Sequence, residues 1–183
     1  KITPQVGDTW RAGELVLKMR GEMKYLYALM DDETRFWIAQ EVARTKFTAD
    51  VRPLFASGKR IAGKRPKVLI TDGAYNFHEA YMKELRTNRC TTPKHVQDIR
   101  MDGIPHNNKM ERLNGEVRDR EKVVRGLKRT DTPILTGCQI FHNYVRPHMS
   151  LEGKTPAELA GIKVEGENKW LTLIQNASRA RRS

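Results

Sequence analysis

The sequence lacks several features whose absence excludes whole classes of protein. None of its apolar runs approaches the roughly 18–20 residues that a membrane-spanning helix requires, and its first residues contain no apolar stretch typical of a signal peptide. Two cysteines, Cys90 and Cys138, are too few for a disulfide framework and are typical of reduced thiols. We therefore expect a globular cytoplasmic protein that has no membrane partner.

Zinc-binding motifs are also missing. The chain has five histidines, but the pair Cys90 and His95 is too sparse for a structural zinc site. His142 and His148 lie on either side of an arginine-proline pair that begins at Arg146. A contact with phosphate or DNA at the end of a helix is one interpretation of that segment. The sequence thus predicts no zinc-binding domain.

Basic residues are abundant and unevenly distributed. Lys and Arg outnumber Asp and Glu by 34 to 22, which gives a formal net charge of +12. Such an excess favours polyanionic partners such as nucleic acids, although ribosomal and membrane-surface proteins share it. The C-terminal arginines are typical of a solvated tail. The other basic clusters lie before a predicted strand and along a predicted helix (Lys59, Arg60, Lys64, Arg65 and Lys67; Arg118, Arg120, Lys122, Arg125, Lys128 and Arg129).

The order of predicted strands and helices indicates an α/β fold. Three runs of strand-forming residues, 13–19, 24–30 and 35–42, are separated by short turns and predict an antiparallel meander. Strands at 67–72 and 95–99 alternate with helices, so they require crossover connections and should pair in parallel. We predict a mixed five-stranded sheet flanked by helices, the main ones at 48–61, 76–85 and 108–127. This domain spans residues 1–162, and a basic tail follows at 163–183.

Two carboxylates stand out in this basic chain. Asp72 ends an apolar run typical of a central parallel strand, and ligands bind beyond the carboxyl ends of such strands. The pair Asp72–Gly73 is also an ordinary turn signal. Glu111 lies in the first turn of the basic helix, where it either closes a capping box with Asn108 or ligates a metal, and spacing does not separate these readings. Carboxylates suit Mg²⁺, and two such ions about 3.5–4 Å apart can clamp a phosphoryl transfer.

Several short motifs, in order along the chain, carry a resemblance to a known family (Lys18-x-x-Gly21-x-x-x-Tyr25-Leu26-Tyr27, Ile70-Thr71-Asp72, Asn107-Asn108-x-x-Glu111, Tyr144-x-Arg146-Pro147-His148-x-x-Leu151 and Thr155-Pro156). From Trp10 to about Ile162 the chain resembles the catalytic domain of DDE-type insertion-sequence transposases, which share the ribonuclease-H-like core of retroviral integrases. The resemblance implies that three acids bind two Mg²⁺ or Mn²⁺ ions. By position, Asp72 is the second acid and Glu111 the third.

The first acid of the family pattern is missing. The pattern places an Asp-Glu pair three residues after a tryptophan, and here Gly13 follows Trp10 at that spacing. Glu14 should point to the opposite face of the strand because side chains alternate, and Asp8 lies five positions earlier. Either the substitution inactivates the domain or Asp8 supplies the carboxylate through a shifted register. We expect catalysis to be lost or strongly impaired. A smaller departure is Asn114, where many relatives carry histidine.

The resemblance implies a DNA transposase core that performs metal-dependent phosphodiester hydrolysis and strand transfer at transposon ends. Arg118, Lys122 and Arg125 would contact the DNA backbone, and the domain would act as a homo-oligomer associated with the nucleoid. The family usually carries a helix-turn-helix module upstream, which we expect to have been lost or trimmed. Two alternatives stay open: a ribonuclease-H-like nuclease without strand transfer, and a catalytically inactive DNA-binding or domesticated remnant.

Overall fold

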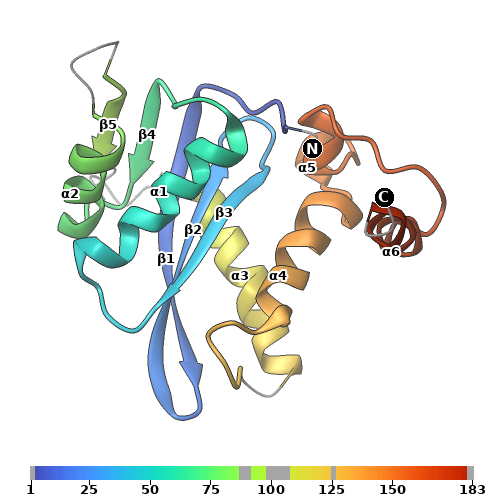
Figure 1. Ribbon diagram of the computed structural model, residues 1–183, viewed down its shortest axis with the longest axis horizontal. Helices are drawn as coiled ribbons and strands as arrows, with labels where there is room; N and C mark the ends of the chain where they lie inside the picture. The colour runs from blue at the N-terminus through green and yellow to red at the C-terminus, as the bar shows by residue number, and fades with distance from the viewer. Residues whose placement is uncertain (1–2, 87–91, 98–107, 125–126, 181–183) are drawn as a thin grey trace.

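The computed structural model describes residues 3–86, 92–97, 108–124 and 127–180. Within these residues, five strands form one sheet in the order β3-β2-β1-β4-β5 (Figure 1). The first three pair antiparallel, and β4 and β5 each add in parallel. The predicted mixed five-stranded sheet is therefore confirmed. The strands are β1 (Thr9–Met19), β2 (Glu22–Asp31), β3 (Trp37–Ala43), β4 (Val68–Thr71) and β5 (Lys94–Gln97).

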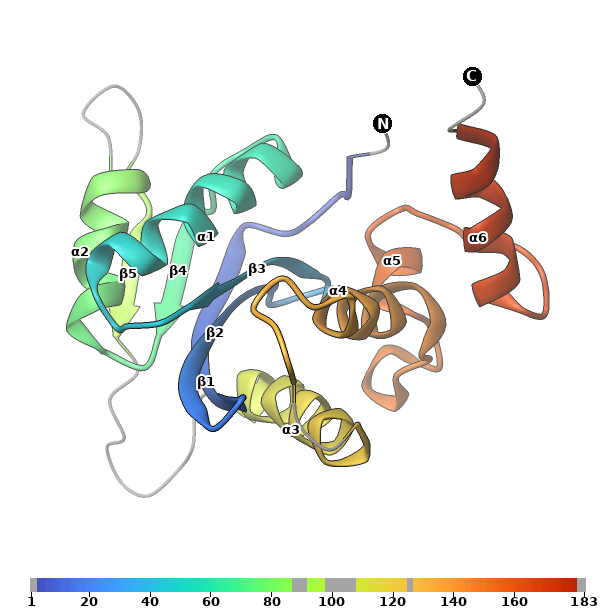
Figure 2. The ribbon, with the colours of Figure 1, turned by 60° about the horizontal axis from the view of Figure 1, so that its bottom comes forward.

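Helices cover both faces of the sheet. Figure 2 shows α1 and α2 on one face and α3 on the other, with α4 beside α3. The described helices are α1 (Thr48–Ala62), α2 (Tyr75–Glu84), α3 (Asn108–Val123), α4 (Pro133–Ile140), the π-helical turn η1 (Phe141–Val145), the 3₁₀ turn η2 (Met149–Leu151), α5 (Pro156–Leu159) and α6 (Lys169–Ala180).

The alternation of side chains along β1 separates two hydrophobic cores. Trp10 and Ala12 are buried in the core under α1 and α2. Leu15 and Leu17 are buried in the second core, together with residues of α3. Because successive strand residues face opposite sides, Gly13 belongs to the face that α3 covers. The position where the sequence lacks its expected carboxylate is thus directed toward the helix that carries Glu111.

Helix α3 is shorter than the sequence predicts. It ends at Val123 rather than at Leu127, and Val124, which follows it, is 38% exposed. Leu127 is buried, but it contributes from outside the helix by forming an isolated parallel bridge with Met19 at the end of β1. Leu127 therefore lies against the β1–β2 hairpin and not on the predicted helix.

The edge strand β3 is closed by a side chain from η1. Asn143 is buried, and its amide accepts a hydrogen bond from the backbone N–H of Trp37 (2.7 Å) and donates one to the carbonyl of Trp37 (2.9 Å). An edge strand otherwise leaves such groups without a ladder partner. The amide pair therefore fixes η1 against the sheet, and with it the neighbouring His142.

The C-terminal segment contains a helix that the sequence analysis did not predict. Helix α6 buries none of its residues, and Lys169 joins it to Glu158 of α5 through an ion pair of 2.9 Å. The division at residue 162 stays a prediction. Among the helices of the described residues, none combines the length and apolar character that crossing a bilayer requires.

Candidate functional site

Gly13 lies directly against the first turn of α3. A Cβ atom built at Gly13 would lie 3.3 Å from Cε and 3.6 Å from Cβ of Met110, and Glu111 is the next residue along the helix. Asn114, one turn later, donates a hydrogen bond from Nδ2 to the backbone carbonyl of Glu14 (3.3 Å). The helix is thus held on β1 at the point where the carboxylate is missing. Gly13 does not have a positive φ, so its backbone conformation does not require glycine.

The register of two parallel strands indicates where Asp72 lies relative to Gly13. The observed pairs include Trp10 with Leu69 and Arg11 with Ile70, and the same register continued by two residues sets Gly13 opposite Asp72. Neighbouring strands lie about 4.8 Å apart. Leu69 is buried under α1 and α2, so alternation directs Asp72 to the face of α3. The continued register therefore predicts that Asp72 faces the same region as position 13 and the turn that carries Glu111.

Local structure around both acids is compatible with each of the roles considered. Asp72 is exposed, and its Oδ1 accepts a hydrogen bond from the N–H of Ala74 (3.1 Å), which is a turn contact that the Asp-Gly pair predicts. Glu111 is exposed in the first turn of α3. Asn108 is the first helical residue rather than the cap, and the residue before it lies outside the described part of the chain.

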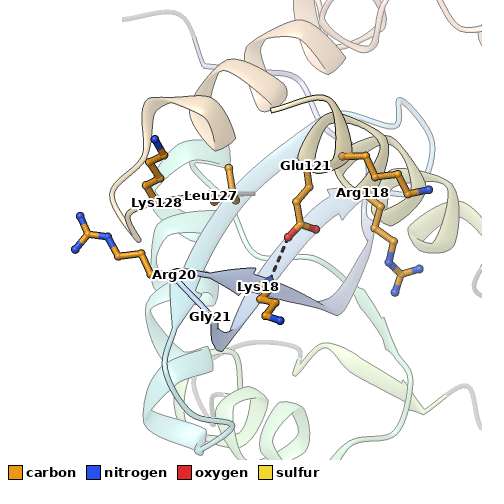
Figure 3. A pocket seen from close by; sticks show the side chains of 8 residues that line it. Lys18, Arg20, Gly21, Arg118, Glu121, Leu127 and Lys128 are labelled. Atoms are coloured by element: carbon orange, nitrogen blue, oxygen red, sulfur yellow. Dashed lines mark hydrogen bonds between the residues drawn. The ribbon is translucent and has the colours of Figure 1, made fainter. Parts of the chain in front are cut away.

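A basic groove of about 790 Å³ lies where α3 crosses the β1–β2 hairpin (Figure 3). The backbone N–H of Lys18 donates a hydrogen bond to Oε1 of Glu121 (3.1 Å), and this contact joins the hairpin to the helix. Five of the lining side chains are cationic and one is anionic, so the groove is strongly positive. It is lined by Lys18, Arg20, Gly21, Arg118, Glu121, Lys122, Leu127 and Lys128.

The groove brings together two of the three residues predicted to contact DNA. Arg118 and Lys122 line it, whereas Arg125 lies outside the described residues. Lys18 and Arg20 were missed because they are distant in sequence. Their contribution depends on α3 crossing the hairpin, which no local pattern indicates.

Comparisons with known proteins agree with this geometry. The sequence matches the family model of the IS240-type transposase DDE domain over residues 7–148. The chain belongs to this DDE domain family. No curated protein matches the sequence. The DDE family uses divalent metal ions and acts in DNA recombination, which are the chemistry and the partner that the sequence predicts for this domain.

Solved structures identify the fold of this DDE domain. A chain of the simian T-cell lymphotropic virus intasome, in complex with PP2A regulatory subunit B56 gamma, matches with a TM-score of 0.64 and 13% identity, covering 87% of this chain and 56% of that one. The DDE domain thus spans just over half of that chain. The HTLV-2 integrase catalytic core domain in complex with magnesium (trimeric form) matches with a TM-score of 0.58 and 16% identity, covering 87% and 98%. The fold is the ribonuclease-H-like core of integrases.

Asp8 does not substitute for the missing acid of the DDE triad. Its carboxylate forms ion pairs with Lys64 (3.0 Å) and Lys67 (2.6 Å), and hydrogen bonds from these two lysines hold its pKa below the usual value. Its carbonyl accepts the N–H of Val68, which begins β4. Asp72 follows the other end of β4, four residues after Val68 and therefore about 13 Å from it at about 3.3 Å per residue. The shifted register that would bring Asp8 to Asp72 does not occur.

Glu14 faces away from α3, as the alternation of β1 predicts. It pairs with Lys46 and lies across from Tyr27, whose pKa is raised by burial and by the charge of Glu14. The other oxygen of Glu14, Oε2, is buried without a hydrogen-bond partner. The pKa of Lys46 is raised by its hydrogen bond with Glu14 and, to a smaller extent, by the charge of Asp72. Lys46 therefore pairs with Glu14 and also lies within the electrostatic influence of Asp72.

The acids present do not fit a two-ion site. Among the described residues, Asp72 and Glu111 form no group of three ligating side chains whose ligand atoms lie within 4.8 Å of one another; such a group exists elsewhere. The three atoms nearest to a Cβ at position 13 all belong to the side chain of Met110. Two carboxylates without the third leave the expected pair of ions one bridging ligand short. We therefore assign no reaction step to metal ions in this chain.

Removing the carboxylate of Asp8 provides a direct check of its role. We expect Asp8→Ala to leave DNA binding and every metal-dependent signal unchanged, because its partners are lysines at the far end of β4. Thermal melts with and without Mg²⁺, together with a plasmid-nicking assay, measure this. Metal-dependent nicking in the unsubstituted chain that disappears in Asp8→Ala would contradict the assignment.

Proposed function

We propose that this chain is a DNA transposase core of the type that hydrolyses phosphodiester bonds and transfers strands at transposon ends, and that Gly13 strongly impairs its catalysis. The observation that carries the proposal is the contact of Gly13 with Met110 in the first turn of α3, at a position that offers no carboxylate. The β1–β4 register, continued by two residues, supports a place for Asp72 opposite Gly13. Asp72 and Glu111 are the proposed remaining metal ligands. DNA binding does not depend on the missing acid and is retained.

The basic groove gives this proposal a path for DNA. Arg118 and Lys122 follow Glu111 by seven and eleven residues, about 10 and 16 Å along the helix axis at 1.5 Å per residue. A DNA strand in a duplex advances about 3.4 Å per phosphate. A backbone that runs along α3 from Glu111 therefore reaches the groove about three to five nucleotides from the catalytic position. The groove then holds DNA flanking the reacting phosphate.

Assembly on paired ends is part of the same proposal. The solved structures that share the fold include dimeric and trimeric forms of an integrase core and an intasome. We infer that this domain also acts as a homo-oligomer on DNA and is associated with the nucleoid. Sedimentation with and without a DNA duplex tests the oligomer. A monomer at all protein and DNA concentrations would contradict it.

The proposal predicts DNA binding without turnover. We expect the chain to bind a labelled duplex with strong salt dependence, and to leave supercoiled plasmid intact in Mg²⁺ or Mn²⁺. If the chain nicks plasmid in a metal-dependent way and Glu14→Gln abolishes this activity, Glu14 supplies the third carboxylate. That result would overturn the proposal that Gly13 impairs catalysis. Any cleavage also discriminates the two enzymatic readings, because joined plasmid products indicate a transposase and hydrolysis alone indicates a nuclease. Asp72→Asn is the matched control, because it removes a proposed ligand with little change in volume.

A further inference from the structure

A cluster of metal-ligating side chains lies outside the DDE site. Glu116 of α3, His142 of η1 and the following His148 each offer one ligand atom, and these atoms all lie within 4.8 Å of one another. It is the one such group among the residues that the structure describes. The cluster lines a second cavity of about 790 Å³, so an ion has access to it from solvent.

Hydrogen bonds already orient two of the three ligands. Nδ1 of His142 lies 2.8 Å from Oε2 of Glu116, and Nε2 of His142 lies 2.9 Å from the backbone carbonyl of Arg35. The carbonyl can only accept, so Nε2 carries a proton and the bond fixes the ring. Metal-ligating histidines are held in this way, with one ring N–H on a carbonyl and the other nitrogen directed at the metal. His142 is 4% exposed, so its orientation is set by the fold.

Arg146 and His148 lie around the carboxylate of Glu116. Arg146 binds the other oxygen of Glu116, Oε1, at 2.8 Å and leaves Oε2 for a ligand. Burial opposes ionisation of Glu116, but the hydrogen bond from His142 and the charges of His142, Arg146 and His148 hold its pKa below the usual value. The ring of His148 packs edge-on against that of His142, with centroids 4.7 Å apart. The third ligand is thus adjacent to the first two.

Only small shifts are needed for a tetrahedral ion. With metal–ligand distances of about 2.0–2.2 Å, neighbouring ligand atoms in a tetrahedral zinc site lie about 3.3 Å apart. The Oε2–Nδ1 contact of 2.8 Å must therefore widen by about 0.5 Å as the ion replaces the bridging proton. His148 must draw in from no more than 4.8 Å. It is half-buried and follows η1 outside any regular helix, so its side chain can adjust.

We propose that Glu116, His142 and His148 bind a Zn²⁺ ion, or a similar first-row divalent cation, with one coordination position left to water. Two imidazoles and one carboxylate suit zinc, whereas Mg²⁺ prefers an all-oxygen set. The site is separate from the DDE acids. Glu116 is five residues beyond Glu111, about 7.5 Å along α3 and on a different side of the helix. A bound ion would join α3 to η1 and so fix the helix that carries Glu111.

Zinc titration of the full chain tests the proposal. After treatment with a chelator, we expect one equivalent of ZnCl₂ to bind by calorimetry and to raise the melting temperature, since a ligand that binds only the folded state stabilises it. CoCl₂ should give the visible absorption bands of a tetrahedral site. His148→Ala should weaken Zn²⁺ binding at least about 10-fold. Mutation of a group that only hydrogen-bonds a metal ligand already lowers metal affinity about 10–100-fold, and His148 is itself a proposed ligand. Glu116→Gln should weaken it similarly.

Three controls make the outcome decisive. His78→Ala removes a histidine of the other close pair, in which Nδ1 of His78 lies 3.2 Å from Nδ1 of His95. Asp72→Ala combined with Glu111→Ala removes the DDE acids, and Cys138→Ser removes a thiol that lines the same cavity. All three should retain the zinc signal. Far-UV circular dichroism and melts in chelator should show that His148→Ala is folded. The proposal would be overturned if the chain does not bind zinc, or if a control variant loses zinc binding while His148→Ala retains it.

Discussion

Replacing Gly13 with aspartate is expected to make the chain respond to Mg²⁺. We expect Gly13→Asp to nick supercoiled plasmid at least about 100-fold faster than the unsubstituted chain, since metal ions contribute several kcal/mol and each 1.36 kcal/mol is tenfold in rate. We also expect its melting temperature to rise on addition of Mg²⁺. The reason is the place of the new carboxylate, opposite Asp72 in the β1–β4 register and beneath the turn that carries Glu111.

The structure can accommodate this side chain if Met110 shifts by a few tenths of an ångström. The closest atom to a new Cβ would be Cε of Met110 at 3.3 Å, which is the flexible end of its side chain. Without metal, however, the carboxylate would be buried beside the charge of Asp72. Burying a polar group without a partner costs about 1–3 kcal/mol, so Gly13→Asp should be less stable than the unsubstituted chain in chelator. Mg²⁺ should remove most of that difference.

Gly13→Asn is the matched control because it has nearly the same volume and no charge. It should be destabilised and should show neither the Mg²⁺-dependent melt nor the nicking activity. Adding Asp72→Asn to Gly13→Asp should abolish both responses. A folded Gly13→Asp chain that melts identically with and without Mg²⁺ would show that position 13 does not complete the site. Equal nicking by the unsubstituted chain would show that no acid was missing.

Much of the fold follows from local patterns. Apolar residues that alternate with polar ones identify the three-stranded meander, and apolar residues at helical spacing identify the crossover helices. The observed sheet confirms both predictions. The same alternation correctly separates Gly13 from Glu14 on opposite faces of β1, because Trp10 and Leu15 fix the two cores. The family pattern then indicates which acid is missing. The predictions of strands and faces are confirmed because each depends on neighbours in sequence, whereas the missing acid stays a prediction.

The remaining features depend on contacts between distant segments. Leu127 continues the apolar spacing of α3, yet it pairs with Met19 on the hairpin. Helix α6 buries no residue, so it leaves no strong core signal in the sequence. Glu116 and His142 are separated by 26 positions in the chain, and zinc motifs are recognised by short spacing. Their proximity follows from Asn143, which fixes η1 on β3.

Removing three cations from the basic groove is expected to weaken DNA binding about 100-fold at low salt. The variant combines Lys18→Ala, Arg118→Ala and Lys122→Ala, all exposed on the groove formed by the hairpin and α3. An exposed ion pair contributes up to about 1 kcal/mol, and three such losses, about 3 kcal/mol, give a factor of this size because every 1.4 kcal/mol is tenfold. The fold should survive, because the contact that joins hairpin to helix uses the backbone N–H of Lys18, which alanine retains.

Salt dependence separates local contacts from net charge. Each phosphate contact contributes about 0.9 to the slope of log affinity against log salt, so the groove variant should lose about 2.7 from that slope. The control combines Lys83→Ala, Lys154→Ala and Arg179→Ala, which removes the same charge from exposed positions on other elements. Fluorescence anisotropy of a labelled duplex at several NaCl concentrations measures both variants. If the control loses as much affinity and slope as the groove variant, DNA is attracted by the net charge of +12, and the path along α3 is wrong. If only the groove variant changes, the DNA backbone lies in the groove between the hairpin and α3.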